Sequence, residues 1–525
     1  MPEARAFCKC GLTPTKQDIK SIEQGVKMLT EQTQQMQTLL EIKAELNKLS
    51  SFDYGLEQPL QILNHHADVL KSEIDAHINT LNTALRDINI RSKRLLSMHL
   101  YRGLAYQDII KNSKGEVICY GDVYMQGLSV NNNTGSGRAN AAFFSRVGLP
   151  SDIEFIEVFG GYTTFYALPK EGNFLYVWGA NVQGCAGVGH TNALSLPVRV
   201  DFPSRVVKVC CGTSESNAKQ SAIALLENGL VYVSGSNSIG ELGVGNTLPL
   251  STFTQNPHLS DIKDIFLCSN GNVGLFMAID NEGALYVCGH NQQGACGNGG
   301  NTNLTLPFKL SFNQKVKLAK ASINTSSNAH YATSMIVLED GSVRGAGYAL
   351  ENNLSQNAAG NLNIFTTLLN EQGEPLSEIV DVFPASIGGT SLALDSNGNL
   401  YAWGKGAYGY GNDNTRANAK AQRVLENVES VQHWDRANTR CVAKLKDTQA
   451  LLAFGFNTDS ALGVGNASNT RAWKNVLLPP AMSEYKLQCF GAEAYLVIIA
   501  DNDIYACGTS KDGSIKYTTP TLQKQ

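Results

Sequence analysis

Cysteine and histidine are the residue types of this chain whose spacing could support chemistry. Cys8 and Cys10 lie two positions apart, as the first half of a metal site would, but no matching Cys or His pair follows nearby. We expect ordinary free thiols there, with an inter-chain disulfide or a metal site as the alternatives. His65 and His66 are adjacent, and on a symmetry axis such a pair could hold an ion or sense pH. The simpler interpretation is a solvated pair beside a helical seam.

Glycine-rich loops are the second candidate for chemistry. The stretch Asn237–Gly245 has the pattern Asn-x-x-Gly-x-x-Gly-x-Gly, and a run of glycines after a strand can cradle a phosphate. A phosphate loop, however, continues into a helix and carries Lys-Ser/Thr, and neither follows here. The pattern also recurs at Asn181–Gly189 and Asn291–Gly299. Because it repeats, we predict turn geometry and close packing rather than phosphate binding.

The sequence contains none of the familiar catalytic motifs: there is no His-Glu-x-x-His, no Gly-x-Ser-x-Gly and no recurrent pair of carboxylates. The nine histidines are scattered along the chain. We therefore predict a protein that is not an enzyme and needs no cofactor or metal. An active site assembled from distant parts of the chain would escape such a search, and this alternative stays open.

Composition excludes several other classes of function. The chain has 525 residues, too many for one ordinary core, so repeats or several domains are expected. Its 42 basic and 46 acidic residues leave a net charge of −4, and no Lys/Arg cluster predicts a nucleic-acid partner. There is no apolar run of membrane-spanning length and no secretory signal at the N-terminus. We expect synthesis in a cytosol without membrane insertion.

An internal repeat organises most of the chain. Eight copies of a short β run end in a glycine, here called the strand-end glycine. Their spacing is between 51 and 58 residues, and they are Gly121, Gly179, Gly235, Gly289, Gly347, Gly404, Gly455 and Gly508. So narrow a spread indicates a repeat architecture, in which these glycines are structural.

Each copy has the same internal order. A β run such as Ala222–Leu226 is followed by a polar turn, Glu227-Asn-Gly229, whose glycine accepts the positive φ of a tight hairpin. The return strand then reaches the strand-end glycine, and two further strands follow the glycine-rich loop. Four short strands in about 55 residues are typical of one propeller blade. Cys288 and Cys507 occupy the slot that holds Trp178 and Trp403 in other copies, so we expect them to fill the core rather than act as nucleophiles.

This repeat resembles that of the regulator-of-chromosome-condensation family. The residues that carry the resemblance are the run Val231-Tyr-Val-Ser-Gly235 and its relatives, followed by Asn-x-x-Gly-x-Leu-Gly-x-Gly. The resemblance covers residues 100–525 and implies a mainly β fold, an RCC1-like β-propeller of seven or eight blades. Family members usually have seven, so either the first and last hairpins share a closing blade or this ring has eight. The family includes exchange factors for a small GTPase, an ultraviolet sensor, a β-lactamase inhibitor and scaffolds. The chain has only four tryptophans, which argues against light sensing.

The first hundred residues differ from the rest. We expect an irregular lead-in over 1–12 and an α-helical coiled-coil segment over 13–99 that precedes the propeller. Its seam is formed by Ile19, Ile22, Val26, Leu29, Met36, Leu40, Leu46, Leu70, Ile74, Leu81, Leu85 and Ile88. One helix cannot bury such a stripe alone, so the two helical runs either fold into a hairpin or, as the heptad spacing favours, join identical chains into a homo-oligomer. The mixed seam residues are compatible with a trimer.

Domain order suggests a function by analogy. A helical stem before a β-rich head resembles the tail fibres and baseplate attachments of bacteriophage virions, which bind other virion proteins or a host surface. We therefore predict a non-catalytic structural or receptor-binding protein, virion-associated if this analogy holds. The alternative is a cellular adaptor or guanine-nucleotide exchange factor for a small GTPase. Asn131–Ala141 and Glu351–Asn363 are the longest Asn/Gly-rich loops, and they are either contact surfaces or plain solvent-exposed insertions.

Overall fold

The computed structural model describes residues 107–111, 117–121, 141–146, 149–150, 153, 155–160 and 164–522, the last range with gaps at 213–219, 271–272, 327–328, 355–359, 407–417, 435–438, 480–484, 491–494, 501–502 and 510–515. The chain divides into the units Met1–Leu96 and Ser97–Gln525, and every described residue belongs to the second. The predicted lead-in, the helical stem with its seam, the Cys8/Cys10 pair and the His65/His66 pair therefore lie outside the described residues.

The described elements are almost entirely β-strands, grouped into eight successive sheets that we call blades 1 to 8. Blades 1 to 4 comprise β1 (Gln107–Lys111), β2 (Val117–Gly121), β3 (Ala141–Arg146); β4 (Phe155–Gly160), β5 (Thr164–Pro169), β6 (Phe174–Gly179), the short 3-10 helix η2 (Val182–Gly184), β7 (Leu194–Asp201); β8 (Val206–Cys211), β9 (Ser221–Leu226), β10 (Val231–Gly235), β11 (Leu250–Gln255); and β12 (Ile262–Asn270), β13 (Val273–Asp280), β14 (Leu285–Gly289), β15 (Leu304–Leu310). Blades 5 to 8 comprise β16 (Val316–Ser326), β17 (Ala329–Leu338), β18 (Val343–Gly347), β19 (Leu362–Thr367); β20 (Ile379–Phe383), β21 (Thr390–Asp395), β22 (Leu400–Gly404), β23 (Asn418–Leu425); β24 (Val428–Trp434), β25 (Arg440–Leu445), β26 (Leu451–Gly455), β27 (Thr470–Asn475); and β28 (Tyr485–Phe490), β29 (Tyr495–Ala500), β30 (Asp503–Thr509), β31 (Lys516–Leu522).

Within each blade the strands pair antiparallel in chain order. Blade 1 has three strands and each of blades 2 to 8 has four, counted over the described residues. The predicted mainly β, propeller-type fold is thus confirmed. The first hairpin (β1–β2) and the last (β29–β30) belong to separate sheets, so they do not share one blade. The sequence left two arrangements open, a closing blade shared by the first and last hairpins or a ring of eight blades. The described strands form eight sheets, as the second arrangement requires.

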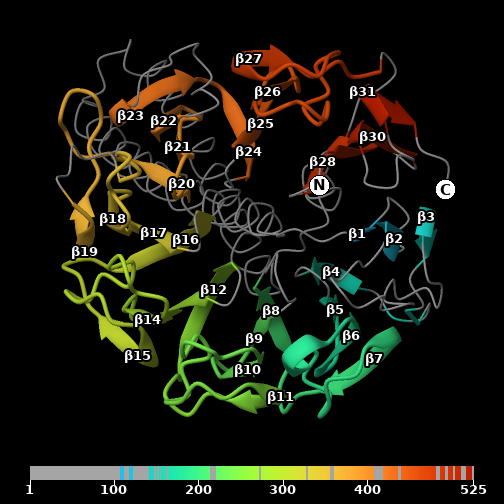
Figure 1. The fold of residues 1–525 in the computed structure, drawn as a ribbon, viewed down its shortest axis with the longest axis vertical. Coiled ribbons are helices and arrows are strands. Elements are labelled where there is room, and N and C mark those ends of the chain that lie inside the picture. The colour runs from blue at the N-terminus through green and yellow to red at the C-terminus, as the bar shows by residue number, and fades with distance from the viewer. Residues whose placement is uncertain are drawn as a thin grey trace, which may run out of the picture. The chain divides into compact units, whose positions relative to one another are not determined.

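The blades follow one another around a common centre, with the first strand of each innermost and the fourth at the rim (Figure 1). First strands of neighbouring blades contact each other, as β4 contacts β8 and β12 contacts β16. The second strand is buried on both faces, which explains the unbroken apolar runs of β9 and β13. The hydrophobic core lies between blades: Ile223 and Val233 of blade 3 pack with Phe276 and Cys288 of blade 4.

Glycines set the ends of the strands. The hairpin-turn glycines Gly229 and Gly283 have φ of 78° and 88°, as the turn pattern predicted. The strand-end glycines of blades 2 to 8 have φ between 95° and 119°. At Gly235 a Cβ would also lie 2.2 Å from the carbonyl oxygen of Gln220, so both conformation and space require glycine. None of the described residues forms a helix long and apolar enough to cross a membrane.

Candidate interaction face

The loop between the third and fourth strands varies most in chemistry from blade to blade. We number its positions from the strand-end glycine, so that the first loop position directly follows that glycine. Because strands alternate in direction, these loops lie at the same end of each blade as the connections between first and second strands. We call this end the loop face.

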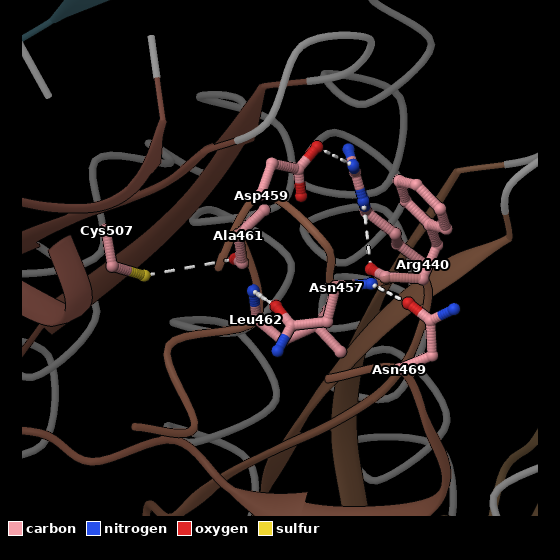
Figure 2. Close-up of polar contacts among 8 residues, drawn as sticks. Arg440, Asn457, Asp459, Ala461, Leu462, Asn469 and Cys507 are labelled. Atoms are coloured by element: carbon pink, nitrogen blue, oxygen red, sulfur yellow. Dashed lines mark hydrogen bonds and ion pairs between the residues drawn. The ribbon is translucent and has the colours of Figure 1, made fainter. Parts of the chain in front are cut away.

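An asparagine at the second loop position pins the loop in four blades. In blade 7 the side-chain oxygen of Asn457 accepts the backbone N–H of Leu462 at 2.9 Å (Figure 2), and its Nδ2 donates to the carbonyls of Asn466 and Ser468. The same brace is made by Asn181, Asn237 and Asn291. A single buried amide thus satisfies three backbone groups, which rigidifies a segment without regular structure.

The glycines of the loop join each blade to the next one. The backbone N–H of Gly189 donates to the carbonyl of Ser251, on the outer strand of the following blade, at 2.8 Å. Gly245, Gly299 and Gly465 make the equivalent bond to the outer strand of the blade that follows their own. These N–H groups are therefore used in packing, as the structural interpretation of the glycine pattern expects.

The slot before the strand-end glycine provides a second link between blades. Trp403 donates its indole N–H to the carbonyl of Asn353 in the preceding blade at 2.8 Å. The thiol of Cys507 points at the carbonyl of Ala461 at 3.9 Å (Figure 2), and Cys288 and Ser234 make the corresponding contact. The accepting carbonyl is always at the sixth loop position. Both thiols are fully buried, as expected for core residues.

Burial keeps those thiols in the protonated state. It raises the pKa of Cys507 to about 12 and that of Cys288 well above its ordinary value. Because the thiolate is the nucleophilic form, neither cysteine is activated. Among the described residues no group of three or more His, Cys, Asp or Glu side chains is placed to hold a metal ion.

The first loop position separates two regions of the ring. Blades 2 and 3 have the small residues Ala180 and Ser236 there. Blades 4 to 7 have large or polar side chains, namely His290, Tyr348, Lys405 and Phe456. In each of these blades the position follows a strand-end glycine of positive φ. We call the first and fourth loop positions of blades 4 to 7, with the residues they contact, the variable sector.

Two aromatic contacts form the blade 4 and blade 5 part of the variable sector. His290 bonds through Nε2 to the side-chain oxygen of Gln293 at 3.0 Å, and its ring meets that of His330 edge-on at 6.2 Å. Burial lowers the pKa of His290, so the imidazole is neutral. Tyr348 packs against Tyr331 at 4.8 Å between ring centroids. Burial, followed by the nearby carboxylate of Glu351, raises the pKa of Tyr348 to about 12.

An ion pair links blades 5 and 6. The ammonium of Lys405 binds the carboxylate of Glu351, which also accepts the backbone N–H of Gly388. The Lys405 side chain is 52% exposed whereas that of Glu351 is 15% exposed, so the cation faces solvent. Blade 5 lacks the asparagine brace because Ala349 occupies its place. Asn353 compensates by donating its amide to the carbonyls of Ala385 and Ser386 in blade 6.

A buried cation occupies the equivalent part of blade 7. Arg440 binds the Asp459 carboxylate and donates Nε–H to the carbonyl of Phe456 at 3.1 Å, with its guanidinium over the Phe456 ring (Figure 2). Burial lowers the pKa of Arg440, whose ordinary value is so high that the group stays charged. Ser221 and Thr333 hold the corresponding carbonyl in other blades with a hydroxyl. In blade 7 an arginine therefore makes, with a charged group, the contact that a neutral hydroxyl makes in those blades.

Sequence reasoning found part of this face. The predicted loop Glu351–Asn363 begins in the variable sector, and its described residues include Glu351 itself; of Asn131–Ala141 only Ala141 is described. The copies of the repeat agree at the strand-end glycines, which the sequence predicted. Tyr348, Lys405 and Arg440 were not singled out from the sequence. Aligning the copies on the strand-end glycine and comparing the residues around it would have indicated them.

Comparison with known proteins identifies the repeat. The family model of the regulator of chromosome condensation (RCC1) repeat matches residues 173–217 and 282–325. Each segment runs from a hairpin turn through the strand-end glycine and the asparagine brace into the next blade. The chain contains RCC1 repeats.

Several known proteins are similar to this chain. The X-linked retinitis pigmentosa GTPase regulators of dog and human are 29% identical over 146 residues, which is 27% of this chain and 14% of those proteins. The match thus spans only a small part of their length. The ultraviolet-B receptor UVR8 of Arabidopsis thaliana is 23% identical over 352 residues, covering 66% of this chain and 74% of the receptor. The crystal structure of yeast RCC1 (Prp20) bound to Kap60 gives a TM-score of 0.50 at 16% identity, covering 79% of this chain and 92% of that one, and this likeness shows the fold.

Proposed function

We propose that this protein is a non-catalytic binding propeller that regulates a small GTPase through the loop face. One observation carries the proposal. The position directly after the strand-end glycine follows a positive-φ glycine in each of blades 2 to 7, yet blades 4 to 7 have His290, Tyr348, Lys405 and Phe456 there. Lys405 is exposed and Phe456 is partly exposed, while His290 and Tyr348 are buried. Equivalent positions whose side chains differ on neighbouring blades, with a cation in solvent, are a feature of recognition surfaces on a rigid frame.

The chemistry of the variable sector favours binding over catalysis. The imidazole of His290 is neutral and buried, and the phenol of Tyr348 is protonated. The carboxylates of Glu351 and Asp459 are held in ion pairs by Lys405 and Arg440. Burial also lowers the pKa of His330, the other histidine of this sector. The exposed ammonium of Lys405 is available to a protein surface of complementary charge.

The choice of a GTPase as partner comes from the relatives. Two of them are named GTPase regulators, and each is 29% identical to this chain over 146 residues. The similarity covers 14% of those proteins, so the partner is part of the proposal. A nucleotide-release assay tests it. Purified full chain is added to a panel of small GTPases loaded with fluorescent GDP, and release is followed with excess unlabelled nucleotide.

We expect accelerated or slowed release, or a stable complex by size exclusion, with at least one member of the panel. Lys405→Glu on the loop face should weaken the effect. Arg199→Glu on outer strand β7 is the matched control, because its side chain is 51% exposed against 52% for Lys405. A panel in which no GTPase binds or changes its release rate would refute the proposed partner. Equal effects of both charge reversals would refute the loop face as the contact.

The virion interpretation remains a prediction. It rests on the order of a helical stem and a β-rich head, and the stem lies outside the described residues. Light scattering on the purified full chain tests its central requirement, a homo-oligomer through residues 13–99. If the full chain were monomeric, the seam would have no identical chain to pair with, and the fibre interpretation would be wrong.

A further inference from the structure

Leu350 is an exposed apolar residue in the middle of the variable sector. Its side chain is 57% exposed although it directly precedes Glu351, whose carboxylate is bound by two groups of blade 6. The equivalent third loop position is an exposed polar residue in blades 3, 4 and 7 and a half-buried valine in blade 2; these residues are Ser238, Gln292, Thr458 and Val182. Blade 5 alone among these five described copies therefore exposes a large apolar side chain at this position.

Hydrogen bonds to blade 6 hold the described part of the loop that carries Leu350. On its C-terminal side the Asn353 carbonyl accepts hydrogen bonds from Trp403 Nε1 at 2.8 Å and Ser391 Oγ at 3.0 Å. The Asn353 amide donates to two carbonyls of blade 6, and the Glu351 carboxylate binds the Gly388 N–H. A side chain displayed on a loop fixed in this way loses little conformational entropy on binding, which favours affinity.

The residue after Leu350, Glu351, forms an ion pair whose cation, the Lys405 ammonium, faces solvent. Lys405 has three N–H donors, of which Glu351 takes one, and half of its side chain is in solvent. The Glu351 carboxylate is turned inward, where Lys405 and the Gly388 N–H occupy it. A ligand that approaches this loop therefore meets an apolar side chain and an ammonium that, among the described residues, is bound on one side by Glu351 and half exposed to solvent. The complementary group is an apolar side chain next to a carboxylate.

We propose that Leu350 and Lys405 form a contact point for a protein segment that carries an apolar residue beside an Asp or Glu. This rests on the proposed binding role of the loop face and names the chemistry of the partner there. It does not depend on the partner being a GTPase. The Glu351 carboxylate and Asn353 act as positioning groups, since they hold the loop and do not face the ligand.

A displayed random peptide library tests the contact point without knowledge of the partner. The library, displayed on yeast, is selected against the immobilised full chain. Enriched peptides should carry an aliphatic or aromatic residue next to Asp or Glu. Leu350→Asp should weaken their binding about tenfold or more, which corresponds to about 1.4 kcal/mol. Leu248→Asp is the matched control, because Leu248 is 68% exposed on the loop of blade 3, whose first and fourth loop positions are uncharged.

Charge reversal provides the second arm. Lys405→Glu should abolish binding of the selected peptides. Replacing the acidic residue of these peptides by Lys should restore binding to this variant but not to the wild type. Thermal melting of all three variants checks that exposed-site changes leave the fold intact. Peptides that bind Leu350→Asp as tightly as the wild type, enrichment of basic sequences, or no enrichment at all would overturn the proposal. GTPase assays that fail while the peptides behave as expected would refute the partner and keep the contact point.

Discussion

Blade 3 and blade 5 stabilise the same loop in opposite ways. In blade 3 the loop is held from within, by the amide of Asn237 bonded to Leu242, Asn246 and Leu248. In blade 5 Ala349 replaces that asparagine, and the loop is held from outside, by contacts of Glu351 and Asn353 with blade 6. A loop that depends on its neighbour can change its own side chains freely. In blade 5 the change of side chains accompanies a transfer of support to the adjacent blade, whereas blades 4 and 7 change their first loop position and keep the asparagine.

The largest expected effect comes from removing the internal brace. Asn237→Ala should lower the free energy of unfolding by about 3 kcal/mol, because the buried Leu242 N–H and two carbonyls lose their partner. Chemical denaturation measures it. The reverse change in blade 5, Ala349→Asn, should shift stability by less than about 1 kcal/mol, since that loop is already held. Near-equal stability of Asn237→Ala and wild type would contradict the internal brace.

Removing one contact of the external support should cost less in total. Trp403→Phe removes the indole N–H that binds the Asn353 carbonyl and should cost about 1.5 kcal/mol. Trp178→Phe is the control, because Trp178 is equally buried and its indole N–H has no partner among the described residues. Both changes remove the same ring atoms. The hydrogen bond is therefore measured by the difference between them, and equal losses would argue against it.

The sixth loop position should make the two loops respond differently to pH. It is Glu241 in blade 3 and Asn353 in blade 5. Burial raises the pKa of the Glu241 carboxyl above its ordinary value of 4.5. The native state then holds the proton more tightly than the unfolded state, so this group favours folding most below pH 4.5 and stability falls as pH rises through that value.

Glu241→Gln tests the pH effect. The substitution removes the titration, so the unfolding midpoint of the variant should fall less than that of the wild type as the pH is raised above 4.5. Asn353→Asp would install the same titration in blade 5. Parallel pH profiles of wild type and Glu241→Gln would show that this carboxyl does not contribute.

The smallest effect on stability is expected at the exposed ion pair. Lys405→Ala should change the free energy of unfolding by no more than about 0.5 kcal/mol, because the ammonium is half in solvent and Glu351 keeps the Gly388 N–H. Denaturation of the variant at low and high salt measures the pair. A loss well above this value would make Lys405 part of the support of the loop rather than of its binding surface.

Local rules were enough to predict the fold. The spacing of Gly235, Gly289 and their equivalents gave the repeat, and hairpin turns such as Glu227-Asn-Gly229 gave the strand pairs, since each depends on residues close in sequence. The buried role of Cys288 followed from the same alignment. Contacts between blades could not be predicted in this way. Lys405 and Glu351 are 54 positions apart, and neither belongs to a motif.

The regularity of the repeat made the candidate face difficult to predict from the sequence. Agreement between copies draws attention to the glycines, which carry backbone geometry, and away from neighbouring positions such as 348, 350 and 405. Predicting that Leu350 is exposed also requires knowing that Glu351 and Asn353 turn toward blade 6. This is a property of the packed ring and not of one copy.

The bond from each glycine-rich loop to the next outer strand has a consequence for the order of synthesis. Gly189 precedes Ser251 in the chain, Gly245 precedes Thr305, and Gly299 precedes Asn363. An outer strand has an open edge, and open edges are sites where chains pair with one another and aggregate. During translation the loop that covers each edge leaves the ribosome before the strand that needs covering. The outer strands of blades 3, 4, 5 and 8 therefore meet this bonding loop already made, and growth from the N-terminus is the direction in which those edges are covered as they form.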